Sequence, residues 1–338
     1  MLAMKLSRNT AALVLCLAWT AFKVDHLAAA DIKIATMRLG TSWYVFGATL
    51  YQLLSPELPQ GTRVEVIAKG GGVGNPITVN SGKAAIGIAN VVTSRWAYEG
   101  HPDIYRNKAQ RNIRALAGGL NSVWFCAMVR EDYIKRTGND TLEKILTSKQ
   151  PIRIVMKPRG STVPVIADLV FESLGTNRQQ IQSNRGRIIQ VDPKQTPAII
   201  RDGRADLYFD AVPLGHPTVT EIALTGNVRF LALPQQTIDF LTERGLTPSA
   251  IPQAFKGQDE PTPSVDLGTL LIANAKLSND QAYLITKTIC ENPERMAQAH
   301  KAWAQFDPTQ AWKPEHNGIP LHPGAERYYR EKGWLTSN

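Results

Sequence analysis

The chain repeats one series of short motifs at a nearly constant spacing. Ile32-Lys33-Ile34 leads into Gly40-Thr41-Ser42, and Ile152-Arg153-Ile154 leads into Gly160-Ser161-Thr162; subtracting 32 from 152 and 40 from 160 gives 120 both times. Further along, residues 81–91 are echoed by residues 202–212, at an offset of 121. Two similar α/β halves predict two lobes with a cleft between them, and a cleft is where a ligand would bind.

Hydrophobic periodicity assigns the elements of each half. Residues 32–36, 64–67 and 85–89 are predicted strands; a helix capped by Ser42 carries an i, i+4, i+7, i+8 apolar stripe, and a second helix starts at Asn75-Pro76. The second half repeats this scheme with strands at 152–156, 187–191 and 207–209, and with helices capped by Thr162 and by Asp192-Pro193. Strands and helices that alternate in this order predict parallel sheets built from right-handed βαβ units.

Two segments are predicted to connect the lobes. Residues 113–129 are typical of two strands interrupted at Gly118-Gly119, and residues 265–273 are typical of one long strand. The chain after residue 273 is predicted to be helical. Lobe I would then contain residues 31–122 and 270–338, and lobe II residues 123–269. Two strands that cross between lobes would act as a hinge.

The N-terminus has the features of an export signal. Lys5 and Arg8 precede a short apolar run, and Ala28-Ala29-Ala30 is an A-x-A cleavage site. The apolar run is too short to span a bilayer, which disfavours the alternative of a membrane anchor. We therefore expect a periplasmic protein that is cleaved after Ala30.

Composition and motifs disfavour several functional classes. The 338 residues carry a net charge of +9, or +7 without residues 1–30, which hold three basic residues and one acidic residue. These charges are dispersed, so nucleic-acid binding is not expected. No nucleophile–base pair or cluster of metal ligands is recognised, and no cofactor or metal is expected. The histidines are expected in turns or on the surface, and Cys126 and Cys290 as single buried thiols.

The turns that open the first helix of each half are the strongest candidate site. Ser42 in one turn, with Gly160, Ser161 and Thr162 in the other, would present hydroxyls and free backbone N–H groups at helix N-termini, which suit a carboxylate or phosphate oxygen. Both turns would face one cleft, because ligands bind at the carboxyl ends of the strands in open α/β sheets. The alternative for each Ser or Thr is a cap without a ligand.

Charged and aromatic side chains near these turns complete the candidate site. Arg159 precedes the second turn and could hold a carboxylate by two parallel hydrogen bonds, although loop arginines are more often solvated. Trp43, Tyr44 and Trp124 would pack against a ligand, unless they belong to the core. The run 69–74 matches no phosphate-binding glycine motif, so its backbone would either approach a ligand or form a flexible turn. Weaker candidates are Lys69, Asn90, Asp210 and Pro213.

Several segments resemble one family of transport receptors. Residues 319–333 (IPLHPGAERYYREKG), residues 80–88 (NSGKAAIGI), residues 97–100 (AYEG) and Gly215-His216-Pro217 are similar to the TAXI family of solute receptors of TRAP transporters. The similarity covers 31–335. The chain departs from the family pattern at residues 37–44, where the family has more glycine and small residues. It departs again at residues 90–94, where an acidic residue of the family is absent. Both segments are expected to line the ligand-binding cleft.

The resemblance implies a fold like that of type II periplasmic binding proteins. It also implies a monomeric receptor that closes over a small organic acid or amino acid and delivers it to a TRAP-type membrane permease. An aromatic or bulkier acid remains open because of Trp43, Tyr44 and Trp124. The alternatives are an exported bilobal enzyme of transferase type and a ligand-sensing module for a membrane sensor.

Overall fold

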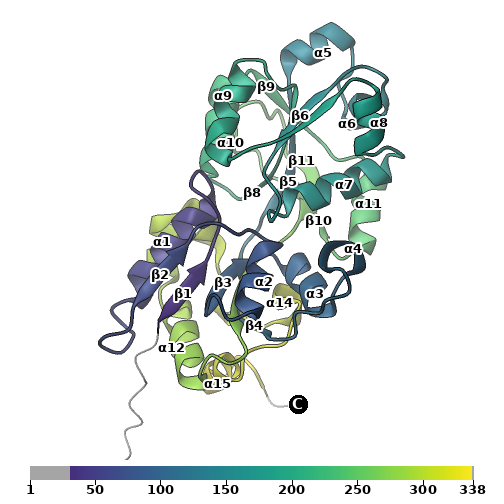
Figure 1. Cartoon of the computed structure of the whole chain (residues 1–338). Helices are drawn as coiled ribbons and strands as arrows, with labels where there is room; N and C mark the ends of the chain where they lie inside the picture. The colour runs from purple at the N-terminus through teal and green to yellow at the C-terminus, as the bar shows by residue number, and fades with distance from the viewer. Residues whose placement is uncertain (1–30, 337–338) are drawn as a thin grey trace, which may run out of the picture.

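The computed structural model describes residues 31–336, which form two α/β lobes, one above the other (Figure 1). The predicted signal peptide, residues 1–30, lies outside the described residues. Within the part that is described, no helix is long and apolar enough to cross a membrane.

The lower lobe in Figure 1, lobe I, is built from the first and last parts of the chain. Its elements are β1 (Ile32–Ala35), α1 (Ser42–Leu54), β2 (Val64–Ile67), α2 (Gly74–Asn80), β3 (Ile86–Ala89), α3 (Val91–Glu99), α4 (Pro102–Tyr105) and β4 (Ile113–Asn121), and after lobe II β12 (Thr269–Asn274), α12 (Asn279–Cys290), α13 (Pro293–Ala299), η2 (Lys301–Gln305), η3 (Pro308–Gln310), α14 (Pro314–Asn317) and α15 (Pro323–Glu331).

Lobe II is built from the middle of the chain. Its elements are β5 (Trp124–Arg130), α5 (Glu131–Thr137), α6 (Leu142–Thr147), β6 (Arg153–Met156), α7 (Val163–Ser173), α8 (Arg178–Ser183), β7 (Arg187–Gln190), η1 (Pro193–Gln195), α9 (Thr196–Arg201), β8 (Leu207–Val212), α10 (Pro217–Thr225), β9 (Val228–Leu231), α11 (Gln235–Glu243), β10 (Thr247–Ile251) and β11 (Thr262–Asp266).

The two sheets share one central topology. In lobe I the strand order is β2-β1-β3-β12-β4, and β1 is parallel to β2 and β3. In lobe II the order is β10-β11-β5-β8-β6-β7, β6 is parallel to β7 and β8, and β9 pairs with β5. The third strand of each repeat, β3 or β8, then pairs antiparallel with β12 or β5. The predicted repeat of parallel βαβ units is confirmed.

The breaks between the connecting strands differ from the predicted ones. β4 continues through Gly118 and Gly119, and the chain leaves it only after Asn121. The pairing of β4 with β12 is irregular, and a Cβ at Gly118 would lie 2.2 Å from the backbone oxygen of His316, so this glycine permits a close approach. The long strand predicted at 265–273 is interrupted between β11 and β12, where Gly268 adopts a left-handed φ of 61°.

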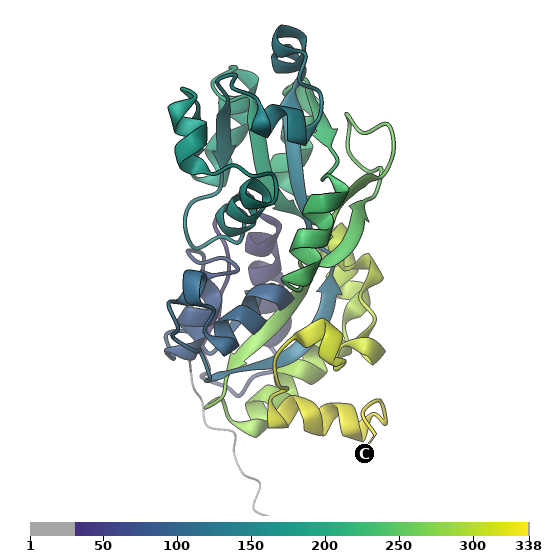
Figure 2. The ribbon, with the colours of Figure 1, turned by 90° about the vertical axis from the view of Figure 1, so that its right-hand side faces the viewer.

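Figure 2 shows strands that run between the two lobes. One carboxylate joins the two crossing points. Oδ1 of Asp266 accepts hydrogen bonds from the backbone N–H of Val123 at 2.7 Å and of Gly268 at 2.8 Å, while Leu267 N donates to Val123 O at 2.8 Å. Burial raises the pKa of Asp266, and these hydrogen bonds oppose that rise. Two short paired linkers between rigid sheets have the geometry of a hinge.

The lobes are stabilised mainly by apolar packing. The predicted stripe of α1, Phe46, Leu50, Leu53 and Leu54, is buried and packs in one cluster with α12 and α15. Each such side chain contributes about 2 kcal/mol on burial. Cys126 and Cys290 are buried free thiols in β5 and α12, as predicted.

Candidate functional site

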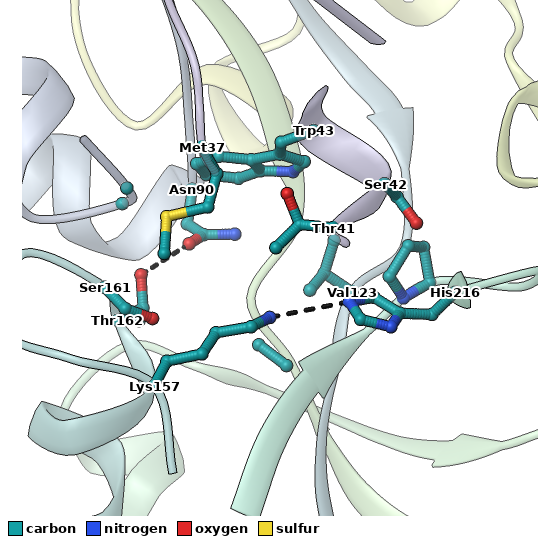
Figure 3. A pocket seen from close by; sticks show the side chains of 14 residues that line it. Met37, Thr41, Ser42, Trp43, Asn90, Val123, Lys157, Ser161, Thr162 and His216 are labelled. Atoms are coloured by element: carbon teal, nitrogen blue, oxygen red, sulfur yellow. Dashed lines mark hydrogen bonds between the residues drawn. The ribbon is translucent and has the colours of Figure 1, made fainter. Parts of the chain in front are cut away.

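A small cavity lies between the lobes, at the carboxyl ends of the parallel strands (Figure 3). Its volume is about 30 Å³, which is room for about two water molecules. Both lobes line it. The lining residues are Met37, Thr41, Ser42, Trp43, Gly71, Gly72, Asn90, Val123, Lys157, Ser161, Thr162, Ala211, Pro213 and His216.

The N-terminus of α1 opens into this cavity. Thr41, and not Ser42 as predicted, is the N-cap, and its hydroxyl accepts from Tyr44 N at 3.3 Å. The hydroxyl of Ser42 lines the cavity instead; the side chain is 1% exposed, and among the described residues its Oγ has no hydrogen-bond partner. The first N–H groups of a helix also lack intrahelical acceptors, so this end offers several donors to a ligand.

The second turn uses its hydroxyls differently. Ser161 Oγ accepts from Val163 N at 3.2 Å and so caps α7, whereas Thr162 occupies the N-cap position without a side-chain capping bond. Thr162 Oγ1 instead donates to Asn90 Oδ1 in lobe I at 2.7 Å, as Figure 3 shows. The two turns reach one cavity, as the repeat predicts, but the second is largely occupied by contacts within the protein.

A buried ion pair lies at the lobe II wall. Met156 in β6 pairs with Phe209 in the parallel strand β8, so the next residues, Lys157 and Asp210, are neighbours. Their side chains form an ion pair; Lys157 is 6% exposed and Asp210 fully buried. The hydroxyl of Tyr208 and the N–H of Ala211 also donate to Asp210. A carboxylate that accepts from all three groups holds the Lys157 ammonium at the cavity wall.

His216 adds a second donor beside Lys157. It is the N-cap of α10, and its Nδ1 accepts from Val219 N at 3.3 Å, so the hydrogen of the neutral ring is on Nε2. Burial lowers the pKa of His216 to about 3; the Asp210 carboxylate opposes this shift, and the nearby Lys157 reinforces it. Nε2 lies 3.5 Å from Lys157 Nζ. Two donors this close together suit an anionic oxygen between them.

The glycine-rich loop contacts the opposite lobe. Val73 N and Gly74 N both donate to Gly160 O of lobe II at 3.1 Å. A Cβ at Gly71 would lie 2.7 Å from the same oxygen, so only glycine permits this approach. Asn75, predicted as the cap of α2, lies inside that helix, and its amide braces the loop through Gly71 N. Gly71 and Gly72 also line the cavity, in keeping with the prediction that this backbone would approach a ligand, and the loop in addition forms part of the interface between the lobes.

Further hydrogen bonds and an ion pair cross the cleft and hold the two lobes close together. Thr218 Oγ1 donates to Gly40 O at 2.7 Å, and Arg38 forms an ion pair with Asp192 at 3.5 Å. On another side, Trp96 Nε1 donates to Arg244 O at 3.2 Å. A ligand that fills the cavity in this arrangement would contact both lobes.

The predicted site residues divide into three groups. Those that line the cavity are Ser42, Trp43, Asn90, Ser161, Thr162 and Pro213. Gly160 and Asp210 act at its border, through the loop contact and the Lys157 pair. The remaining four do not line it: Tyr44, Lys69 and Arg159 are exposed, and Trp124 is buried in lobe II with its Nε1 donating to Ser249.

The cation at the cavity is Lys157, and not Arg159 as predicted. The repeat itself contained the missing signal, because Lys157 lies 120 residues after Met37 and both line the cavity. Of the histidines expected in turns or on the surface, His216, His300 and His322 are buried, and each caps a helical turn through Nδ1. Among the described residues, no group of three His, Cys, Asp or Glu could hold a metal ion.

Comparison with known proteins places the chain in a family. The sequence matches the NMT1-like family over residues 34–333, so the chain belongs to that family. The structure is similar to MatC from Rhodopseudomonas palustris with bound malate (TM-score 0.53, 11% identity, 90% of this chain and 97% of that chain). It is also similar to a binding protein component of an ABC phosphonate transporter from Pseudomonas aeruginosa (TM-score 0.51, 12% identity, 83% and 80%). The predicted two-lobed fold of type II periplasmic binding proteins is confirmed.

Proposed function

We propose that this protein is a solute-binding receptor that closes its two lobes over a small organic anion. The observation that carries the proposal is the pair of donors at the cavity wall, Lys157 Nζ and His216 Nε2, 3.5 Å apart. The unpartnered Ser42 hydroxyl lines the same cavity from lobe I. A ligand that binds donors of both lobes at once favours the closed state, since those contacts exist only there.

The hinge at residues 122–123 and 267–268 would allow that closure. We propose that residues 31–122 with 270–338, and residues 123–269, move as two rigid units. Small-angle X-ray scattering with and without ligand measures this directly, because closure reduces the radius of gyration. An unchanged scattering curve at saturating ligand would contradict the movement.

The central experiment is a thermal-shift screen of carboxylates, sulfonates and phosphonates. A ligand at one hundred times its Kd stabilises the folded state by about 2.7 kcal/mol, which corresponds to a rise in Tm of roughly 5 °C. Arg159→Ala is the matched control, since it removes an exposed cation two residues from Lys157. It should keep the ligand-induced rise.

The variant of Lys157 needs a compensating change. Lys157→Met alone leaves Asp210 buried without its ion pair, which costs about 3–5 kcal/mol and could unfold the protein. In Lys157→Met with Asp210→Asn both charges are removed together. The double variant should fold and lose the ligand-induced rise; a rise equal to that of the wild type would refute Lys157 as the anion-binding residue.

We also propose that the closed receptor delivers its ligand to a TRAP-type permease. The support is the resemblance of residues 319–333 and 80–88 to TAXI receptors. Ligand uptake into vesicles that contain the permease subunits should then depend on the receptor and on an ion gradient. Uptake that needs ATP and ignores the gradient would contradict this part of the proposal.

Export is the remaining part of the proposal. The support is the n-region, apolar run and A-x-A site within residues 1–30. Mass spectrometry of the protein from a periplasmic fraction should show a mature chain that begins at Asp31. Recovery of the intact chain with Met1 from the cytoplasm would contradict it.

A further inference from the structure

We propose that the ligand is a small monoanion without an ammonium group, such as a short-chain monocarboxylate, and that dicarboxylates and α-amino acids bind far more weakly. This inference rests on the proposed function and narrows its ligand class. Three features of the cavity support this inference: its charge balance, the groups that it offers to a ligand ammonium, and its small size with a largely apolar remainder.

The charge of the site is balanced before any ligand enters. Of the described residues, Lys157 is the only charged one that lines the cavity, and Asp210 already neutralises it. Of the two arginines near the helix-opening turns, Arg38 is paired with Asp192 and Arg159 is exposed to solvent. One anionic group can be held by the remaining Lys157 protons, His216 Nε2–H and the N-terminus of α1. A second anionic group would be buried without a partner.

Of the described residues, no Asp or Glu lines the cavity to pair with a ligand ammonium. Asp210 does not line the cavity; it is fully buried and accepts from Lys157, Tyr208 and Ala211 N. The amide oxygen of Asn90 faces the cavity, but it accepts from Thr162. An α-amino acid would therefore bury its ammonium without a counter-charge, at a high desolvation cost.

The rest of the cavity is apolar and small. Met37, Trp43, Val123, Ala211 and Pro213 form its other walls. The small volume, about 30 Å³, favours the shortest aliphatic chains beside the anionic group over longer ones. Neither Tyr44 nor Trp124 lines the cavity, so the aromatic acid that the sequence left open is not favoured.

Matched ligand pairs test this inference by isothermal titration calorimetry at pH 7. Propionate and succinate differ by a second carboxylate, and lactate and alanine differ by a hydroxyl in place of an ammonium. We expect propionate and lactate to bind at least about tenfold more tightly than succinate and alanine. Ser42→Ala should weaken the binding of lactate by about tenfold. It should leave the Tm of the ligand-free protein unchanged, since the Ser42 hydroxyl has no hydrogen-bond partner among the described residues.

The outcomes separate this inference from the proposed function. Succinate or alanine binding as tightly as its partner would overturn the monoanion inference, while a receptor for small anions would remain. If none of the four ligands bound and the broader screen found no anion, both proposals would be refuted. Tight lactate binding that Ser42→Ala left unchanged would refute the geometry proposed for the anionic group.

Discussion

Replacing Gly72 by alanine should prevent the lobes from closing without unfolding either one. Gly72 lies in the glycine-rich loop of lobe I, and its φ is outside the left-handed region, so alanine can adopt its backbone conformation. A Cβ there would lie 1.9 Å from Thr162 Oγ1 of lobe II and 2.5 Å from Asn90 Oδ1. These two atoms form the 2.7 Å hydrogen bond across the cleft, which the new methyl group would displace.

The expected magnitude follows from that bond. Losing a hydrogen bond costs about 1 kcal/mol, and leaving its buried donor or acceptor unsatisfied adds about 1–3 kcal/mol. Closure would become less favourable by about 2–4 kcal/mol, so the affinity for the ligand should fall by roughly 30- to 700-fold. The Tm of the ligand-free protein should change by less than about 2 °C, because the closer contact, with Thr162, is between the lobes, and the contact within lobe I is with the end of the flexible Asn90 side chain.

Gly74→Ala is the control from the same loop. Its Cβ would lie 3.7 Å from Gly160 O and 3.8 Å from Gly160 Cα, which are ordinary van der Waals distances. Calorimetry with the anion that most stabilises the wild type should show normal affinity for Gly74→Ala and a large loss for Gly72→Ala. A Kd for Gly72→Ala within threefold of the wild-type value would refute the argument that this contact limits closure.

Two further predictions concern buried titratable groups. Burial lowers the pKa of His216 to about 3 and of His300 to about 4, so between pH 6.5 and 4 the unfolded chain binds protons that the folded chain does not. Stability should therefore decrease as the pH falls through this range, by up to about 1.4 kcal/mol per pH unit for each histidine; an unchanged urea midpoint from pH 7 to pH 5 would contradict this. Burial raises the pKa of the thiols of Cys126 and Cys290, and both should react with a thiol reagent only after unfolding. Rapid labelling of either thiol in the folded protein would show that the local structure opens.

Much of the fold could be predicted because the patterns involved are local. The stripe of α1, the parallel strand repeat and the cap at Asp192 depend on periodicity and on residues a few positions apart. The predicted breaks in the connecting strands were misplaced, because a glycine in a strand pattern can have either of two structural roles. Gly118 permits a close contact within β4, whereas Gly268 ends a strand in a left-handed conformation, and only the packed neighbours distinguish these uses.

The candidate site could be predicted only in part. The repeat located the turns at Ser42 and at Ser161-Thr162, and these line the cavity. Arg159 was the natural choice for a cation because it is the charged residue next to the turn. A side chain's direction, however, depends on strand register and on the fold of the turn, which place Arg159 in solvent and Lys157 inside.

By itself, therefore, the sequence determined the two-lobed architecture, since a pattern of strands, turns and helices repeated at a constant offset can only form two similar βαβ units. The tertiary structure decided what the cleft contains. The register of β6 against β8 pairs Lys157 with Asp210, the cap of α10 directs His216 Nε2 beside them, and the approach of the lobes brings Ser42 opposite. Each contact joins residues distant in sequence, so it depends on distances that no local pattern encodes.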